Sequence, residues 1–205
     1  MQAAILQLNV TDDPVANLAV TVGMLHEAAA DGAEFVLTPE VTNCISTSRN
    51  HQRDVLQFEE DDQTLAALRA EAKALGITLL IGSLGVQTGD ADGRFANRSF
   101  LIGPDGDVIA RYDKIHMFDV QISETETWRE SEGYRPGEAA VVADAGFAKI
   151  GMSICYDVRF SHLYRALARA GAQILTVPAA FSPVTGAAHW HALLRARAIE
   201  SGCFV

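Results

Sequence analysis

Short apolar runs that alternate with amphipathic helical segments constrain the fold of this 205-residue chain more than any other feature. Residues 34–38, 77–82 and 173–177 are nearly continuous in apolar side chains, which is typical of strands buried on both faces. Residues 14–31 and 62–75 precede two of these runs and place apolar side chains on one helical face. The alternation predicts an α/β protein in which helices cover the faces of β-sheets.

The middle of the chain departs from this alternation and predicts a hairpin. Residues 94–102 and 108–112 alternate between apolar and polar side chains, and a Gly-Pro-Asp-Gly turn joins them. Residues 113–138 are predicted to form a long polar loop, and loops of this length in compact domains are usually functional or disordered. A further helix is predicted at residues 189–199. We therefore expect sheets of mixed strand direction within a single domain over residues 1–205.

Charge and cysteine content exclude several classes of function. The chain has a formal net charge of −10 and a pI near 4.9, whereas proteins that bind nucleic acid or anionic membranes carry basic patches. No apolar stretch is long enough to span a bilayer, and the N-terminus lacks the basic lead of a signal peptide. Three cysteines fit reduced thiols better than a disulfide framework. We expect a cytoplasmic protein with no nucleic-acid or membrane partner.

Cys155 stands where a predicted strand meets a predicted helix. Residues 148–154 are predicted as the strand, and residues 163–170 have helical apolar spacing and end before a glycine. A cysteine at such a turn can project its sulfur at the sheet edge. The helix N-terminus favours a thiolate and binds developing anions. This is the geometry of a covalent catalyst, although most buried cysteines only fill space.

A thiol that attacks a carbonyl or a nitrile needs a base, an oxyanion stabiliser and a leaving-group acid. Glu40 follows the strand at residues 34–38, and Lys114 follows the second hairpin strand. Both can therefore converge with Cys155 at one sheet edge. Taken singly, Glu40 also fits a solvated loop carboxylate and Lys114 a surface lysine. Glu130 lies inside the long polar segment and carries almost no signal by itself.

Three segments resemble, in the family's order, the catalytic motifs of the nitrilase superfamily of carbon–nitrogen hydrolases. They are residues 37–40, 112–119 and 155–160. The resemblance covers essentially the whole chain and implies a four-layer α-β-β-α sandwich. It also implies that Cys155 is the nucleophile, Glu40 the general base and Lys114 the catalytic lysine. Glu130 corresponds to a second glutamate that family members carry in this loop.

The same resemblance implies a thioester mechanism that needs no cofactor. Glu40 takes the proton of Cys155, and the thiolate attacks the amide carbon. Lys114 and the backbone N–H of Tyr156 stabilise the tetrahedral oxyanion. Glu40 then protonates the departing ammonia and activates the water that hydrolyses the thioester. Glu130 holds Lys114 and helps to orient Glu40. Two carboxylates beside one lysine are expected to raise the pKa of at least one of them.

Residues 185–190 and 193–200 resemble the amidase branch that hydrolyses deaminated glutathione, and the ω-amidases that act on α-ketoglutaramate are the main rival. Both substrates carry carboxylates, so a cation is expected near Cys155. Arg159 is the candidate, and a structural ion pair with Asp157 is the equal alternative. Two other classes stay open. One is a catalytically inactive family member that acts as an oligomer or interaction module. The other is a redox or glutamine-amidotransferase-like protein in which a histidine partners Cys155.

Departures from the family pattern concern the elbow helix and the C-terminus. Ser161 is expected to cap the helix after Cys155. Residues 203–205 fit the start of a strand, and family members continue past this point, so the chain is expected to be incomplete at its C-terminus. The family's contacts between subunits imply a homodimer or a higher homo-oligomer. His189 and His191 do not have the spacing of a zinc site, and no metal is expected.

Overall fold

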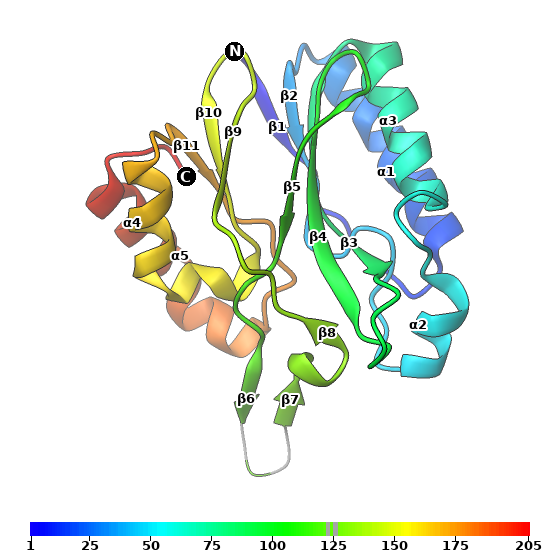
Figure 1. The fold of residues 1–205 in the computed structure, drawn as a ribbon. Helices are drawn as coiled ribbons and strands as arrows, with labels where there is room; N and C mark the ends of the chain where they lie inside the picture. The colour runs from blue at the N-terminus through cyan, green and yellow to red at the C-terminus, as the bar shows by residue number, and fades with distance from the viewer. Residues whose placement is uncertain (122–123, 125–126) are drawn as a thin grey trace.

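The structure is a computed structural model that describes residues 1–121, 124 and 127–205. Figure 1 shows four layers, in which two facing β-sheets lie between helices on either side. The outer layers are α1 (Pro14–Ala30) with α3 (Gln63–Leu75), and α4 (Ser161–Arg169) with α5 (Pro183–Ser201). The α-β-β-α sandwich predicted from the sequence is therefore confirmed.

The larger sheet has six strands and follows the chain order over five of them. These five are β1 (Ala3–Ile5), β2 (Phe35–Leu37), β3 (Thr78–Gln87), β4 (Phe95–Ile102) and β5 (Val108–Asp113). β1, β2 and β3 run parallel, whereas β4 is antiparallel to both β3 and β5. The sixth strand, β8 (Tyr134–Arg135), pairs with β4. The predicted hairpin is confirmed as β4 and β5.

Helix α3 begins and ends where the sequence predicts. The Asp62 carboxylate accepts the Leu65 N–H at the N-terminus, which satisfies a backbone donor that has no partner within the helix. Gly76 closes the helix at φ +66°, a left-handed conformation that glycine adopts without steric cost. The helix then leads directly into β3.

The smaller sheet has the order β11-β10-β9. Its strands are β9 (Val141–Asp144), β10 (Lys149–Met152) and β11 (Ile174–Thr176), of which β10 and β11 are parallel. Phe204 forms a parallel bridge with Ile174, which confirms the strand-like reading of residues 203–205. Ser161 does not cap α4: Phe160 holds the cap position and Ser161 is the first helical residue, so the predicted cap was wrong.

Several elements differ from the sequence prediction. Helix α2 (Arg49–Val55) was not predicted, and α5 starts six residues before the predicted helix at residue 189. The predicted loop at residues 113–138 was wrong in part. It contains β6 (Asp119–Gln121) paired with β7 (Thr127–Arg129), then a 3-10 turn η1 (Glu130–Glu132) and β8. Residues 122, 123, 125 and 126 of that segment lie outside the described residues.

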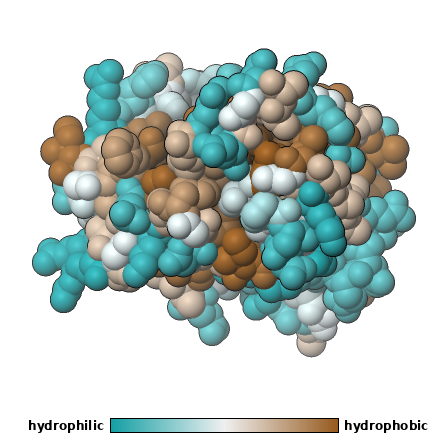
Figure 2. All heavy atoms as spheres, turned by 90° about the horizontal axis from the view of Figure 1, so that it is seen from above, coloured by the Kyte–Doolittle hydropathy of each residue, from teal (hydrophilic) through white to brown (hydrophobic). Residues whose placement is uncertain are grey.

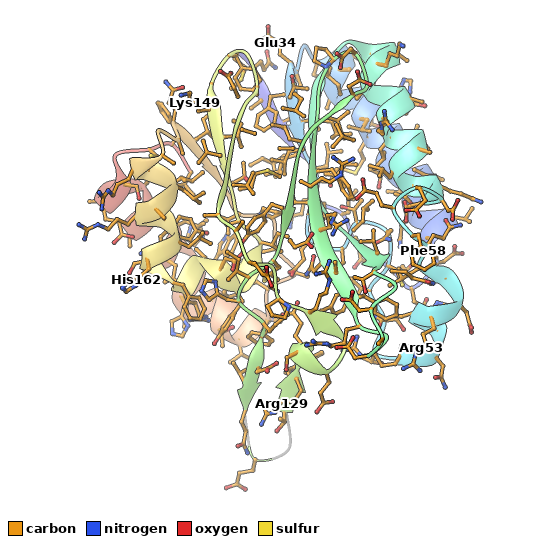
Figure 3. The ribbon with its side chains drawn as sticks, in the orientation of Figure 1. Glu34, Arg53, Phe58, Arg129, Lys149 and His162 are labelled. Carbon is orange, nitrogen blue, oxygen red and sulfur yellow. The ribbon has the colours of Figure 1, made fainter. Side chains whose placement is uncertain are left out.

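The strand directions place the candidate catalytic segments at one end of the sandwich. Glu34, just before β2, and Lys149, at the start of β10, lie at the upper end in Figure 3, and Arg129 lies at the lower hairpin. β2 and β10 therefore run toward the hairpin. Figure 2 views the opposite, upper end, where hydrophilic and hydrophobic side chains are interspersed. No helix of the described part of the chain is both long and apolar enough to cross a membrane.

Candidate active site

Glu40, Lys114 and Glu130 meet between the sheets in one buried ion cluster. The Lys114 Nζ lies 2.8 Å from Glu40 Oε1 and 2.9 Å from each oxygen of Glu130. Lys114 is 2% exposed and Glu40 is 5% exposed. Glu40 follows β2, Lys114 follows β5 and Glu130 begins η1, so three separate segments supply the cluster. The sequence prediction that strand ends bring Glu40 and Lys114 together agrees with this geometry.

Neutral donors complete the coordination of both carboxylates. The Ala180 N–H donates to Glu40 Oε2 at 2.9 Å, and the Phe118 N–H donates to Glu130 Oε2 at 2.6 Å. The Asn97 Nδ2 donates to Glu40 Oε1 at 2.9 Å and reaches Glu130 Oε1 at 3.4 Å. Asn97 was missed by the sequence prediction. The available signal was an amide at an inward position of an alternating strand.

Cys155 begins the 3-10 turn η2 (Cys155–Arg159) that follows β10 and precedes α4. Its φ is +48°, a left-handed conformation that costs energy for a residue with a Cβ. The backbone holds this conformation because the Cys155 N–H donates to the Pro178 carbonyl at 2.8 Å. The side chain is 7% exposed, and the Glu40 carboxylate lies close enough to change its pKa. The predicted elbow is thus present, with backbone strain at the cysteine itself.

The electrostatics of the thiol differ from the sequence prediction. Burial raises the pKa of the Cys155 thiol well above its ordinary value of 9.0, and the Glu40 carboxylate adds to the rise. Lys114 opposes this effect but does not overcome it. The predicted thiolate at a helix N-terminus was therefore wrong for the resting protein. The thiol is neutral, since loss of solvent outweighs the helix dipole at this buried position.

The charges of the ion cluster stabilise one another. Burial alone would raise the pKa of Glu40, but the charge of Lys114 and its hydrogen bond lower that pKa below the ordinary value of 4.5. The predicted rise was wrong for Glu40. Burial alone would lower the pKa of Lys114, but Glu40 and Glu130 raise it well above 10.5. An ionised Glu40 beside a neutral thiol is a base poised to accept the thiol proton.

Asp157 connects the turn that carries Cys155 to the strand that precedes Lys114. It is fully buried, and its Oδ2 accepts from the Tyr112 hydroxyl at 2.6 Å and from the Ile154 N–H at 2.9 Å. Its Oδ1 lies 3.0 Å from the donating His116 N–H and 2.6 Å from His116 Nδ1. His116 therefore supports the segment of Lys114, as predicted. The carboxylate fixes the two segments relative to each other.

Tyr156 and Arg159 lie in the same turn as the thiol. The Tyr156 N–H donates no hydrogen bond within the part of the chain that the structure describes. The Arg159 guanidinium carbon lies 5.7 Å from the centre of the Tyr156 ring and 5.4 Å from that of Phe181. Its Nη1 is 3.3 Å from His189 Nδ1. The alternative pairing of Arg159 with Asp157 is wrong, because other partners occupy that carboxylate.

The other cysteines and histidines lie apart from this cluster. Cys44 is buried, and burial together with Asp12 raises its pKa to about 11. Cys203 and Cys44 are both free thiols. His162 projects outward from the start of α4 (Figure 3). Among the described residues, no group of three or more His, Cys, Asp or Glu side chains is arranged to hold a metal ion.

Comparison with protein families matches residues 2–205 to the carbon-nitrogen hydrolase family. Among curated proteins, the chain is 38% identical to the deaminated glutathione amidase of Yersinia enterocolitica over 98% of its own length and 70% of that protein. It is 37% identical to the chloroplastic omega-amidase of Arabidopsis thaliana, over 97% of its own length and 54% of that protein. The chain thus spans between about half and about three quarters of the relatives it matches.

Solved structures show the same architecture. The NitFhit protein of C. elegans superposes with a TM-score of 0.91 at 34% identity, over 98% of this chain and 49% of that one. An amidase from Nesterenkonia sp. AN1 superposes with a TM-score of 0.81 at 27% identity, over 99% of this chain and 76% of that one. The structure of that amidase shows acrylamide added at its active site cysteine.

Proposed function

This chain belongs to the carbon–nitrogen hydrolase family, and from that premise we propose that it is a cysteine amidase acting on a small carboxylate-bearing amide, of which deaminated glutathione is the leading candidate. The observation that carries the proposal is the buried cluster in which Lys114 bridges Glu40 and Glu130 beside the Cys155 thiol. The proposal treats residues 1–205 as one catalytic domain. It requires only side chains of this chain, the amide and water.

The reaction begins with transfer of the thiol proton. Glu40 accepts the proton as the Cys155 sulfur bonds to the amide carbon, because the raised pKa of the thiol disfavours a free thiolate. The carbonyl oxygen becomes an oxyanion that the Lys114 ammonium and the Tyr156 N–H stabilise. Glu40 passes the proton to the nitrogen, the C–N bond breaks, and ammonia leaves a thioester on Cys155.

Water completes the cycle. Glu40 takes a proton from the water as its oxygen adds to the thioester carbon. The C–S bond then breaks, the carboxylic acid leaves, and the proton returns from Glu40 to the sulfur. Lys114 stays protonated throughout, since its pKa lies well above the ordinary value of 10.5. Glu130 holds the ammonium in place through both carboxylate oxygens.

Arg159 is the proposed partner of the substrate carboxylate. Its guanidinium lies four residues from Cys155 against two aromatic rings, and no carboxylate of the described residues pairs with it. We expect Arg159→Ala to raise KM for carboxylate-bearing amides about 10- to 100-fold, the loss of a charged hydrogen bond. Turnover of a neutral amide should stay close to wild type. Arg165→Ala, an exposed arginine of α4, is the matched control.

The decisive experiment measures ammonia release from deaminated glutathione, α-ketoglutaramate and a simple aliphatic nitrile, with Cys155→Ala as the control. Cys155-dependent turnover of deaminated glutathione supports the proposal, and faster turnover of α-ketoglutaramate supports an ω-amidase instead. Relatives of both names match this chain. A folded protein that turns over none of them and whose Cys155 resists alkylation is an inactive interaction module.

Assembly and location form part of the same proposal. We propose a homodimer or higher homo-oligomer in a reducing cytoplasm, where the three free thiols remain reduced. Light scattering coupled to size-exclusion chromatography tests the assembly. A monomer at the concentration used for the activity assay contradicts it. Fractionation of the source cells tests the location.

A further inference from the structure

We propose that Asn97 is a positioning residue that holds Glu40 and Glu130 on Lys114 and keeps Glu40 ready to accept the Cys155 proton. The inference rests on the proposed function, because it takes Glu40 as the base. Asn97 lies in β4, in the middle of the larger sheet, and is 2% exposed. It belongs to none of the three motifs that identify the family.

One residue contacts three members of the cluster. The Asn97 Nδ2 donates to Glu40 Oε1 at 2.9 Å and lies 3.4 Å from Glu130 Oε1. The Asn97 backbone carbonyl accepts the Lys114 N–H at 2.9 Å. The side-chain amide therefore fixes both carboxylates, while the backbone fixes the lysine between them. A displacement of Asn97 would move all three groups together.

The charges determine which way the amide faces. Glu40 and Glu130 only accept hydrogen bonds when ionised, so an amide oxygen turned toward them would be repelled. The Nδ2 must face the carboxylates, and the Oδ1 is left buried without a partner among the described residues. Burying an unpaired oxygen destabilises the fold. Fold stability alone therefore does not account for Asn97, whereas donation to two catalytic carboxylates does.

Asn43 shows how a structural asparagine in the same protein differs. It is also buried, and its Nδ2 donates to the Gly85 carbonyl at 2.9 Å while its Oδ1 accepts the Gly85 N–H at 3.0 Å. Both ends of the Asn43 amide are satisfied by backbone. Gly85 pairs with Asn97 across β3 and β4, so the two asparagines lie in neighbouring parts of the sheet. Asn43 is thus a matched control.

Asn97 also supplies a donor without adding charge. Two carboxylates and one ammonium give the cluster a net charge of about −1 when all three are ionised. A second cation at position 97 would compete with Lys114 for both carboxylates. A neutral amide compensates part of the excess negative charge and leaves the ion pairs intact.

The test compares Asn97→Asp and Asn97→Ala with wild type in two pH profiles, those of kcat/KM for an amide and of Cys155 alkylation by iodoacetamide. Each variant removes the donor to Glu40, and Asn97→Asp adds a third carboxylate. We expect the acid limb of both profiles to move to higher pH in Asn97→Asp, with rates about tenfold or more below wild type in mild acid. The rates should recover as the pH rises, and Asn97→Ala should shift less.

Asn43→Ala should lower the melting temperature without moving either profile. The inference is overturned if folded Asn97→Asp or Asn97→Ala keeps the wild-type profiles, or if activity falls equally at every pH. Should Asn97→Asp fail to fold, the uncharged Asn97→Ala decides by the same criterion. If wild type hydrolyses no tested amide, only the proposed function fails, because the alkylation profile still reports the action of Asn97 on Glu40 and Cys155.

Discussion

The two sheets contribute opposite kinds of chemistry to the candidate site. The larger sheet and its loops supply Glu40, Lys114 and Glu130, three charged groups held by several short hydrogen bonds each. The smaller sheet supplies Cys155, a neutral thiol on a strained backbone with φ +48°. Charge is thus concentrated on one side, and reactivity waits on the other side until a proton moves between them.

This difference explains how a nucleophile can be buried without becoming a permanent anion. The ion cluster stabilises its own charges, so the pKa values of Glu40 and Lys114 move away from neutrality. The thiol pKa moves in the direction that keeps it neutral. The protein holds a ready base and a protonated nucleophile side by side, and a bound amide completes the arrangement. Asp157 keeps the two sides in register.

Removal of the shared cation gives the largest expected effect. Lys114→Met leaves two buried carboxylates without their ion pair, which should destabilise the fold by about 3–5 kcal/mol. Amide hydrolysis should fall about 10³-fold or more, since the oxyanion loses a fixed positive charge. Urea unfolding and steady-state kinetics measure the two effects. Lys73→Met, at an exposed position of α3, is the control.

A stable Lys114→Met protein with normal activity would mean that the carboxylates do not depend on this lysine. A protein that loses activity but not stability would mean that solvent or protonation of a glutamate compensates for the missing ammonium. In that case the double variant Lys114→Met with Glu40→Gln should show no further gain in stability. A large gain would restore the ion-pair account.

Loss of the connection between the two sides should have the next largest effect. In Asp157→Asn the new amide N–H₂ must face either the Tyr112 and Ile154 donors or the His116 donors, so one set loses its acceptor. We expect about 1–3 kcal/mol of destabilisation. A shift of the Cys155 turn relative to Lys114 should lower kcat about 10²-fold.

Calorimetry and single-turnover acylation of the thiol measure the two consequences of Asp157→Asn. Asp54→Asn, at an exposed position of α2, serves as the control. Unchanged acylation in a destabilised protein would show that Asp157 serves the fold alone. The connection between the sheets would then have no part in catalysis.

Sequence reasoning located the site where chemistry follows strand ends. Glu40, Lys114 and Cys155 each come after an apolar or alternating run, and the carboxyl ends of such strands can converge. Asn97 and Asp157 were assigned no such role because their partners lie more than thirty residues away along the chain. A local pattern carries no record of such pairing.

The missed elements have similar causes. Helix α2 is polar along most of its seven residues, so it has no apolar periodicity, and β6 and β7 have three residues each, too few for an alternation to be recognised. The direction of the Cys155 pKa shift also required the structure. The helix N-terminus could be predicted from the sequence, but the extent of burial could not.

The acid side of the stability profile tests the charged half of the site. The folded pKa of Glu40 lies below its ordinary value of 4.5, so ionisation of Glu40 stabilises the fold above that value. This stabilisation is lost as the pH falls through the folded pKa. Glu40→Gln should therefore be less stable than wild type near neutrality, and the difference should shrink below pH 4.5.

Urea unfolding at a series of pH values measures this difference, with the exposed Glu60→Gln as the control. A difference that stays constant from neutral to acid pH would show that Glu40 contributes through packing or neutral hydrogen bonds. A difference that grows in acid would reverse the sign of the inferred pKa shift. Either result would remove the self-stabilised ion cluster from the comparison between the two sheets.

The smallest expected signal concerns the neutral half of the site. Since the pKa of Cys155 lies well above 9.0, the ultraviolet absorbance of a thiolate should not differ between wild type and Cys155→Ala at neutral pH. In Glu40→Gln the thiol loses a repelling carboxylate, and Lys114 keeps its attraction. The pKa of Cys155 should fall, so a thiolate should be easier to detect in that variant as the pH is raised. The same variant should still hydrolyse amides slowly, because it gains a thiolate but loses the base that carries the proton to ammonia. A wild-type thiolate at neutral pH would place the negative charge on the sulfur before the substrate binds, and the division between a charged sheet and a neutral one would fail at its central residue.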